Sequence, residues 1–252
     1  MSSKRKFKAI ICDIDGTLIL NKRDALPSKK VIKAIKKANK FIHVGVATSR
    51  PLFAAQRVIE VLELSGLCIL YGGSQIYDSL KKSVVWEKPI SKSCVKQVSN
   101  ILKKSTAPVF IPNELKKENI LLVDANDDRV LQFWVHGIEI EELHELEKAL
   151  AKIKDICAHR IPSWKKGLTD LTITHKNASK THGIHQLIRS LGLKKKDIIA
   201  IGDGMNDIPL FKACGFKVAM GNASPELKAI ADYVAPPVEK DGIVDVIEKF
   251  IL

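Results

Sequence analysis

Four groups of polar residues stand where apolar runs end or where helical patterns begin. They are Asp13 with Asp15, the triplet Thr48-Ser49-Arg50, Lys180, and the run from Gly202 to Asp207, which includes Asp203 and Asn206. Carboxylates that share a partly buried site repel one another and are poorly solvated, so they need a cation or they take up protons. The four aspartates of these groups offer hard oxygen ligands, and this donor set suits Mg²⁺.

Clustered carboxylates beside a metal ion can do covalent chemistry on a phosphate ester. With the metal holding a phosphate oxygen and neutralising charge, one carboxylate can attack phosphorus. A second carboxylate can protonate the leaving oxygen and then take a proton from the water that hydrolyses the aspartyl phosphate. Two aspartates close together would therefore have two different roles.

The residues around the four groups predict the elements that position them. In the first third we expect strands at residues 8–12, 43–47 and 67–70 and helices at 27–40 and 51–64. The same rhythm returns near the end, with helices at 180–191 and 207–214, strands at 197–201 and 217–220, and a helix start at Ser224-Pro225-Glu226. Apolar strands separated by amphipathic helices predict an α/β fold with a doubly wound parallel sheet. Because reactive groups collect at the carboxyl ends of such strands, we expect the four groups to form one site.

The middle of the chain has a different pattern. Helices are expected at 91–104 and 139–154, strands at 120–124, 130–136, 156–161 and 168–174, and a turn at Ala125–Asp128. This order of elements, a helix and two strands followed by a second helix and two strands, predicts an α+β module with an antiparallel sheet. We therefore expect an inserted domain at residues 84–176 that divides a core made of residues 1–83 and 177–252.

Composition excludes several classes of protein. With 46% hydrophobic residues the chain can bury a core. It contains no run of about 18 uncharged apolar residues that would predict a membrane-spanning helix, and its first residues lack the pattern of an export signal. Five scattered cysteines without a C-x-x-C pair favour reduced thiols and argue against zinc. We expect a soluble, cytoplasmic protein without a membrane partner; the sequence carries no signal for its oligomeric state.

The formal charge of +13 lies mostly near the N-terminus, where residues 1–83 carry 16 Lys/Arg against 6 Asp/Glu. Many of these lysines lie in residues 28–40, opposite an apolar stripe of Val31, Ile32, Ile35 and Ala38. This pattern is typical of a solvated surface helix. No zinc finger, RNP-like or helix-turn-helix pattern accompanies the charge, so we do not expect nucleic acid as the main partner. A general attraction for anionic substrates fits better.

Taken in order, four motifs resemble those of the haloacid dehalogenase (HAD) superfamily of phosphatases. They are D-I-D-G-T at 13–17, T-S-R at 48–50, S-K-T at 179–181 and G-D-G-M-N-D at 202–207. The resemblance spans almost the whole chain and is closest to the Cof-like branch, in which a C2-type (IIB) α/β cap follows the second motif. It implies a Rossmann-like HAD core with an inserted α+β cap, phosphoric monoester hydrolase activity and Mg²⁺ as cofactor.

The resemblance also implies roles for single residues. Asp13 resembles the nucleophile and a metal ligand. Asp15 resembles the general acid/base, with its backbone carbonyl also reaching the metal. Thr48 and the backbone N–H that follows it would hold the transferring phosphoryl group, and Lys180 would neutralise charge on that group and on Asp13.

The remaining motif residues complete the predicted site. Asp203 resembles the other metal ligand, and Asp207 resembles a ligand or a partner of the ligands. Asn206 resembles a phosphate or substrate contact, and Ser49 and Arg50 belong to the predicted substrate-binding set with Thr48 and Lys180.

Three positions depart from the family pattern. Ser49 and Thr181 stand where glycine is usual, which puts close backbone approach to phosphate in question at both points. The stretch from Tyr71 to Ile76, Y-G-G-S-Q-I, stands where the Cof-like branch has Asn-Gly-Ala. We expect this last departure to affect substrate orientation and not the chemistry.

Within the expected cap, tryptophan is mostly a core or interface residue. Trp164 is the one exception, since Pro162–Gly167 could form a loop that faces the core, where Lys165 or Lys166 could meet an anionic substrate. His159 and Arg160, on an expected strand, are further candidates for substrate contact.

The expected function is therefore Mg²⁺-dependent hydrolysis of a small phosphorylated metabolite, a sugar phosphate or a phosphoglycolate-like compound, through an aspartyl phosphate. Three alternatives stay open at this point. A sugar phosphomutase would need a bisphosphate activator. A receiver-type switch would keep a long-lived aspartyl phosphate, which the general acid/base Asp15 and the inserted module argue against. A basic nucleic-acid-binding protein with an inactive site would show salt-sensitive binding and no turnover.

Overall fold

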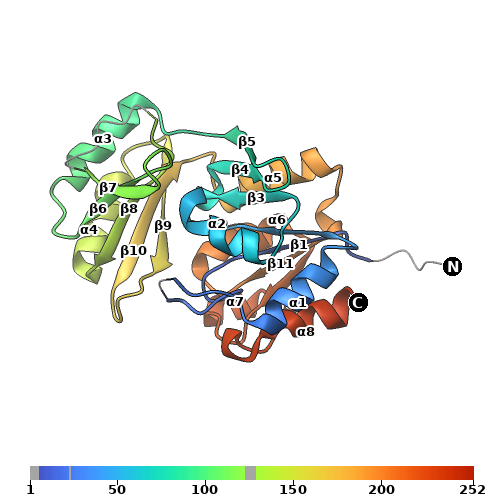
Figure 1. The fold of residues 1–252 in the computed structure, drawn as a ribbon. Helices are drawn as coiled ribbons and strands as arrows, with labels where there is room; N and C mark the ends of the chain where they lie inside the picture. Colours follow the sequence, from blue (N-terminus) through green and yellow to red (C-terminus); the bar gives the residue numbers. More distant parts are fainter. Residues whose placement is uncertain (1–5, 23, 123–128) are drawn as a thin grey trace.

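Strand β1 (Ala9–Cys12) is buried along its whole length and lies inside a five-stranded sheet. The strand order of this sheet is β13-β12-β11-β1-β2, and every pair of neighbouring strands in it runs parallel. The other strands are β2 (His43–Val46), β11 (Ile198–Gly202), β12 (Phe216–Ala219) and β13 (Tyr233–Val234). The structure is a computed structural model and describes residues 6–22, 24–122 and 129–252 (Figure 1).

Helices cover both faces of the parallel sheet because its strands are apolar on both faces. Ile10 and Cys12 point into one cluster, with α1 (Lys29–Ala38), α2 (Leu52–Val61) and α8 (Gly242–Phe250). Ala9 and Ile11 point into the other cluster. The helices on that side are α5 (Lys180–Leu191), α6 (Ile208–Ala213) and α7 (Pro225–Ala229). This arrangement confirms the doubly wound α/β core.

Local signals in the sequence set several helix starts. Ser28 caps α1 by accepting a hydrogen bond from the backbone N–H of Val31, and Ser224 caps α7 in the same way from Leu227. Pro225 occupies the first position of α7, where a missing N–H costs nothing. Helix α5 begins and ends where the sequence predicts, at residues 180 and 191.

A second, three-stranded antiparallel sheet adjoins the core. It consists of β3 (Leu67–Leu70), β4 (Gln75–Asp78) and β5 (Ser83–Glu87). The sequence predicts only the first of these strands, because β4 and β5 are short and lack a long apolar run. It was wrong to expect this strand, at 67–70, in the parallel sheet, because β3 pairs with β4 along its whole length. One parallel bridge between Ala47 and Ile69 links β3 to the end of β2.

The middle of the chain forms the cap region, a five-stranded antiparallel sheet with two helices (Figure 1). Its strand order is β7-β6-β8-β10-β9. The elements are α3 (Lys92–Leu102), β6 (Val109–Asn113), β7 (Glu118–Leu121), β8 (Phe133–Ile138), α4 (Ile140–Leu150), β9 (Ile156–Pro162) and β10 (Thr169–His175). The helices cover one face, where Phe133, Val135 and Leu171 are buried. An antiparallel cap region therefore accompanies the core, as predicted.

Two details of the cap region differ from expectation. Strand β6 was not predicted. Its apolar run is short and ends at Pro112, and proline is unfavourable within a strand. Strand β7 begins at Glu118, two residues before the expected strand, whose last residues and following turn at Ala125–Asp128 lie outside the described residues.

The division into residues 1–83, 84–176 and 177–252 stays a prediction. Strand β5 pairs with β4 across residue 83, so the three-stranded sheet extends to Glu87. In the described part of the chain, no helix combines the length and the apolar character needed to cross a membrane.

Candidate active site

The carboxyl ends of three neighbouring parallel strands bring the predicted groups together. Asp13 follows β1, Thr48 follows β2 by one residue, and Asp203 follows β11. The backbone N–H of Asp13 donates to the carbonyl of Ile201, and that of Ala47 donates to Cys12. The sheet ladder thus holds these loop starts side by side, as expected for a doubly wound fold.

Three carboxylates and one ammonium form the centre of the site. Asp13, Asp203 and Asp207 each place a carboxylate oxygen within 4.8 Å of the others. The Nζ atom of Lys180 lies 3.1 Å from Oδ2 of Asp13 and 2.6 Å from Oδ1 of Asp207. The side chains of Lys180 and Asp207 are 2% and 0% exposed. Three formal negative charges against one positive charge leave an excess of two, which a divalent cation would neutralise.

Burial makes this excess of negative charge costly. Burial, and then the charge of Asp207, raises the pKa of Asp13 to about 7 against the attraction of Lys180. The same two causes, followed by Asp13, raise the pKa of Asp203 to about 8. Burial alone would lower the pKa of Lys180, but the two carboxylates Asp13 and Asp207 raise it, so this lysine stays charged.

The three carboxylates are not equivalent. Oδ1 of Asp207 accepts from Lys180, and its Oδ2 accepts the backbone N–H groups of Asp203 and Gly204 at 3.0 and 3.2 Å. Both oxygens of Asp207 are therefore engaged, one with Lys180 and the other with the backbone of the loop after β11. Asp203 accepts from the Thr17 hydroxyl at 3.2 Å. Oδ1 of Asp13 accepts the backbone N–H of Ile14 at 2.8 Å, and its Oδ2 faces Lys180. The three carboxylates offer the hard oxygen ligands that suit Mg²⁺.

Asp15 has a different environment from Asp13. Its two carboxylate oxygens accept from Nε and Nη2 of Arg50 at 2.8 and 2.6 Å. The third nitrogen of that guanidinium, Nη1, donates to the carbonyl of Ala54 at 3.1 Å. Arg50 therefore faces Asp15 and helix α2, and its predicted contact with substrate stays a prediction.

The other predicted phosphate contacts lie around the same centre. The Thr48 side chain is buried, and its hydroxyl accepts from the backbone N–H of Arg50 at 3.1 Å. Nδ2 of Asn206 lies 3.5 Å from Oδ2 of Asp13. Ser49 is half-buried between Thr48 and Arg50. The structure thus brings these side chains to the same site.

Two glycines permit close approach of segments that are distant in sequence. Gly16 has a φ of +72°, and a Cβ atom there would lie 2.1 Å from Oδ2 of Asp203. Gly73 has a φ of +120°, and a Cβ atom there would lie 2.1 Å from the carbonyl oxygen of Ser179. The first glycine brings the chain after β1 against Asp203, and the second lets the 3₁₀ turn Tyr71–Gly73 reach the start of α5, where Lys180 lies.

The departure at Thr181 has a structural explanation. The Thr181 hydroxyl donates to the carbonyl of Pro209 at 2.7 Å, so this side chain ties α5 to α6.

Sequence reasoning missed several residues of the site. Nδ2 of Asn222 donates to the carbonyl of Gly16 at 2.8 Å and lies 3.5 Å from Asp203. Glu114 and Tyr71 contact each other beside α2, at 2.5 Å. Nothing in the sequence around Asn222 or Glu114 marks either residue, because both reach the site through the tertiary fold.

The candidate residues of the cap have mixed surroundings. Trp164 packs edge-on against Trp134 and His136, with ring centroids 6.1 and 6.2 Å away. Arg160 is exposed and forms an ion pair with Glu147. His159 is partly buried, and its Nε2 atom has no hydrogen-bond partner among the described residues. Burial and the charge of Lys180 lower the pKa of this imidazole.

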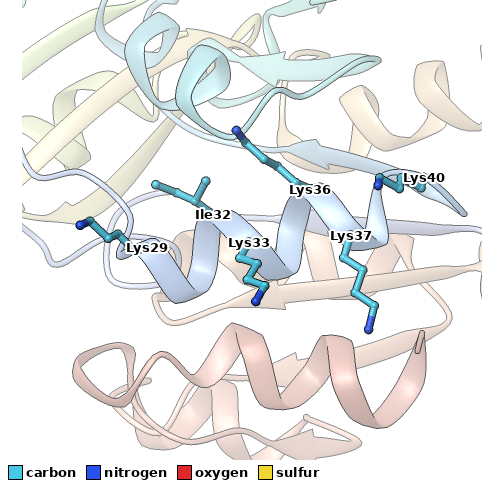
Figure 2. A pocket seen from close by; sticks show the side chains of 6 residues that line it. All are labelled: Lys29, Ile32, Lys33, Lys36, Lys37 and Lys40. Carbon is cyan, nitrogen blue, oxygen red and sulfur yellow. The ribbon is translucent and has the colours of Figure 1, made fainter.

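A pocket on the outside of α1 is a separate feature. Figure 2 shows the side chains that line it: Lys29, Ile32, Lys33, Lys36, Lys37 and Lys40. None of the predicted site residues belongs to this lining. The lysines are the solvated face that the sequence predicts, since Val31, Ala34, Ile35 and Ala38 are the buried residues of the helix. Ile32, which the sequence places in the buried stripe, is only partly buried and lies beside the lysines.

Comparisons with known proteins identify the family and the fold. Residues 10–122 and 111–247 match the haloacid dehalogenase-like hydrolase family. The 5-amino-6-(5-phospho-D-ribitylamino)uracil phosphatase YcsE of Bacillus subtilis (strain 168) is 28% identical over 97% of this chain and 96% of its own length. The phosphoglycolate phosphatase of Methanosarcina acetivorans is 28% identical over 96% of each chain. A solved HAD subclass IIB sugar phosphatase shares the fold, with a TM-score of 0.79, 24% identity, and coverage of 96% of this chain and 98% of its own. Because the family match covers most of the sequence, the chain belongs to the haloacid dehalogenase-like hydrolase family and is a phosphatase.

Proposed function

We propose that this phosphatase uses Mg²⁺ to hydrolyse a small phosphorylated metabolite, a sugar phosphate or a phosphoglycolate-like compound, through an aspartyl phosphate on Asp13. The observation that carries the proposal is the buried cluster of Asp13, Asp203 and Asp207 around Lys180, with its excess of two negative charges. Such a cluster is costly without a divalent cation and is suited to binding one.

In this proposal some residues bind the metal ion or position its ligands, and others surround the phosphoryl group. Asp13 and Asp203 would hold the metal, together with the backbone carbonyl of Asp15, while Asp207 keeps Lys180 and the loop after β11 in place. Bound Mg²⁺ would supply charge neutralisation at the phosphate oxygens. Lys180, Thr48 and Asn206 surround the position that the phosphoryl group would take beside Asp13, with Ser49 next to them.

The reaction would proceed in two balanced steps. In the first, an Oδ atom of Asp13 forms a bond to phosphorus, the bond from phosphorus to the leaving oxygen breaks, and the carboxylic proton of Asp15 passes to that oxygen. In the second, a water oxygen attacks phosphorus, its proton passes to Asp15, and the bond from phosphorus to Asp13 breaks. The products are an alcohol and inorganic phosphate, and both aspartates regain their first protonation states.

The substrate class rests on the relatives and on the cap. One relative is named for a phosphorylated pyrimidine, one for phosphoglycolate, and one solved neighbour is a sugar phosphatase. All three names describe small phosphomonoesters or enzymes that act on them. A cap region that contacts the core beside the site suits a small leaving group, since a large one would be hard to enclose.

A substrate panel tests the proposal. Phosphate release from 2-phosphoglycolate, glycerol 3-phosphate, glucose 6-phosphate and p-nitrophenyl phosphate is measured with Mg²⁺ and with EDTA, for the wild type, Asp13→Asn and Asp155→Asn. Asp155 is an exposed carboxylate paired with Lys176, so its variant is the matched control. We expect turnover only with Mg²⁺, and a loss of about a thousandfold or more in Asp13→Asn alone.

Two outcomes would contradict the proposal. Equal rates in the wild type and Asp13→Asn would exclude Asp13 as the nucleophile. Turnover that needs a sugar bisphosphate, with phosphate moved to another position of the sugar and not released, would favour a phosphomutase.

A further inference from the structure

One carboxylate of the cap region, which has no role in the proposed reaction, forms hydrogen bonds to the core. Glu114 lies in the turn between β6 and β7. Its Oε1 accepts from the backbone N–H of Leu52 at 2.8 Å, and its Oε2 accepts from that of Phe53 at 3.3 Å. Its Oε1 also accepts from the Tyr71 hydroxyl at 2.5 Å. A single cap side chain therefore makes three hydrogen bonds to two segments of the core.

Helix α2 needs such a partner at its N-terminus. Its N-cap residue is Pro51, whose side chain makes no capping hydrogen bond. The first N–H groups of a helix have no partner within the helix, and the positive end of the helix dipole favours a carboxylate there. Glu114 supplies the cap from a position 62 residues away in the sequence.

The two segments that Glu114 joins are the ones that hold Arg50. The backbone N–H of Tyr71 donates to the carbonyl of Arg50 at 3.0 Å. On the other side, Nη1 of Arg50 donates to the carbonyl of Ala54 in the first turn of α2, at 3.1 Å. Arg50 in turn donates two hydrogen bonds to Asp15. A continuous set of contacts thus runs from the cap to the predicted general acid/base.

We infer that Glu114 is a positioning residue: by capping α2 and binding Tyr71 when the cap region lies on the core, it fixes Arg50, and Arg50 sets the direction of the Asp15 carboxyl group. Both oxygens of Asp15 accept from Arg50 in this structure, so one of them must exchange that bond for the proton that it gives to the leaving group. The inference rests on the proposed function, because it takes Asp15 as the acid. It makes acid catalysis dependent on the position of the cap region.

Leaving-group dependence separates this role from a merely structural one. The specificity constant kcat/KM reports the steps up to departure of the leaving group. An alkoxide needs a proton from Asp15 to depart, whereas p-nitrophenolate departs with little help. Loss of acid positioning should therefore slow alkyl phosphates much more than p-nitrophenyl phosphate.

The experiment compares Glu114→Ala, Glu114→Gln and Glu118→Ala on p-nitrophenyl phosphate and on the best alkyl phosphate among 2-phosphoglycolate, glycerol 3-phosphate and glucose 6-phosphate. Glu118 is an exposed carboxylate on the same hairpin and is the matched control. We expect Glu114→Ala to lower kcat/KM for the alkyl ester about tenfold and for the aryl ester less than about threefold. Glu114→Gln keeps an acceptor oxygen and should recover part of the loss, and Glu118→Ala should match the wild type.

A readout independent of activity checks the contact itself. Amide hydrogen exchange in a peptide covering residues 50–61 should become faster in Glu114→Ala and stay unchanged in Glu118→Ala, because only the first variant frees the N–H groups of Leu52 and Phe53. If exchange becomes faster while both esters slow equally, Glu114 is a structural contact and the positioning role is wrong. The role is also wrong if Glu114→Ala speeds alkyl turnover, or if neither ester changes.

The proposed function fails in a different way. In that case the wild type itself hydrolyses none of the four esters, or Asp13→Asn keeps the wild-type rate, whatever the Glu114 variants do.

Discussion

Single residues in this protein show how space and backbone conformation select a residue type. Gly73 combines a φ of +120° with a missing Cβ atom that would lie 2.1 Å from a backbone oxygen of Ser179. Gly167 has a φ of +83° and no atom within 4 Å of its missing Cβ. The first glycine is required by conformation and by contact, and the second by conformation alone.

This contrast predicts different costs for the same substitution. Gly73→Ala should lower the free energy of unfolding by about 3 kcal/mol or more, because the new methyl group must displace Ser179 in addition to straining the backbone. Gly167→Ala should cost about 1 kcal/mol. Urea unfolding of both variants measures the difference. Equal costs would show that the approach of the Tyr71–Gly73 turn to α5 is not tight.

At the scale of elements, helix α1 buries Val31, Ala34, Ile35 and Ala38 and exposes a row of lysines, with Ile32 beside them (Figure 2). Lys29, Lys33 and Lys37 are successive neighbours at spacing i, i+4, and like charges at this spacing repel. The first turn of α1 also contains no acidic residue to offset the helix dipole. The helix is therefore held by its packing against the sheet, in spite of its surface charge.

Lys33→Glu should stabilise the protein, because it turns two repulsive pairs into attractive ones. We expect a gain of about 0.5–1 kcal/mol in the free energy of unfolding at low salt, falling as salt is added. Lys33→Gln, which only removes the repulsion, should give about half of this gain. Urea unfolding of both variants at two salt concentrations measures these changes in the free energy of unfolding. A loss of stability in Lys33→Glu would mean that this lysine makes a favourable contact instead.

At the scale of the whole molecule, the buried carboxylates link stability to pH and to metal. The pKa values of Asp13 and Asp203 are raised from 3.8 to about 7 and about 8 by burial first and by Asp207 second. The folded protein without metal therefore binds more protons than the unfolded chain between about pH 4 and pH 8. In this range stability is highest at the acidic end and decreases as pH rises through 7 and 8.

The prediction concerns thermal unfolding in EDTA and in Mg²⁺. Without metal, the Tm should fall by about 5 °C from pH 6 to pH 8. Mg²⁺ should raise the Tm more at pH 8 than at pH 6, since metal binding displaces protons from its ligands. The variant Asp203→Asn should show a flatter dependence on pH. A Tm that is constant or rises over this range in EDTA would contradict the role given to these carboxylates.

Much of the fold could be predicted because it depends on local patterns. Continuous apolar runs locate β1, β2, β11 and β12 of the parallel sheet, helical patterns locate α1 and α5, and the Ser224-Pro225-Glu226 start locates α7. The strands β4, β5, β6 and β13 could not be found in this way, because each is short and takes its stability from pairing with a neighbouring strand.

The sequence by itself determined which residues would meet at the site, since Asp13, Thr48 and Asp203 each follow a strand whose apolar pattern predicts a place in a parallel sheet. Only the tertiary structure decided their partners. Arg50 faces Asp15 across 35 positions, Asn222 reaches Gly16 across 206, and Glu114 caps α2 across 62. Periodicity and spacing report on neighbours within a few residues. Contacts across such separations depend on the path of the whole chain, and that path decided that Asp207 holds Lys180 and that a cap side chain touches the core.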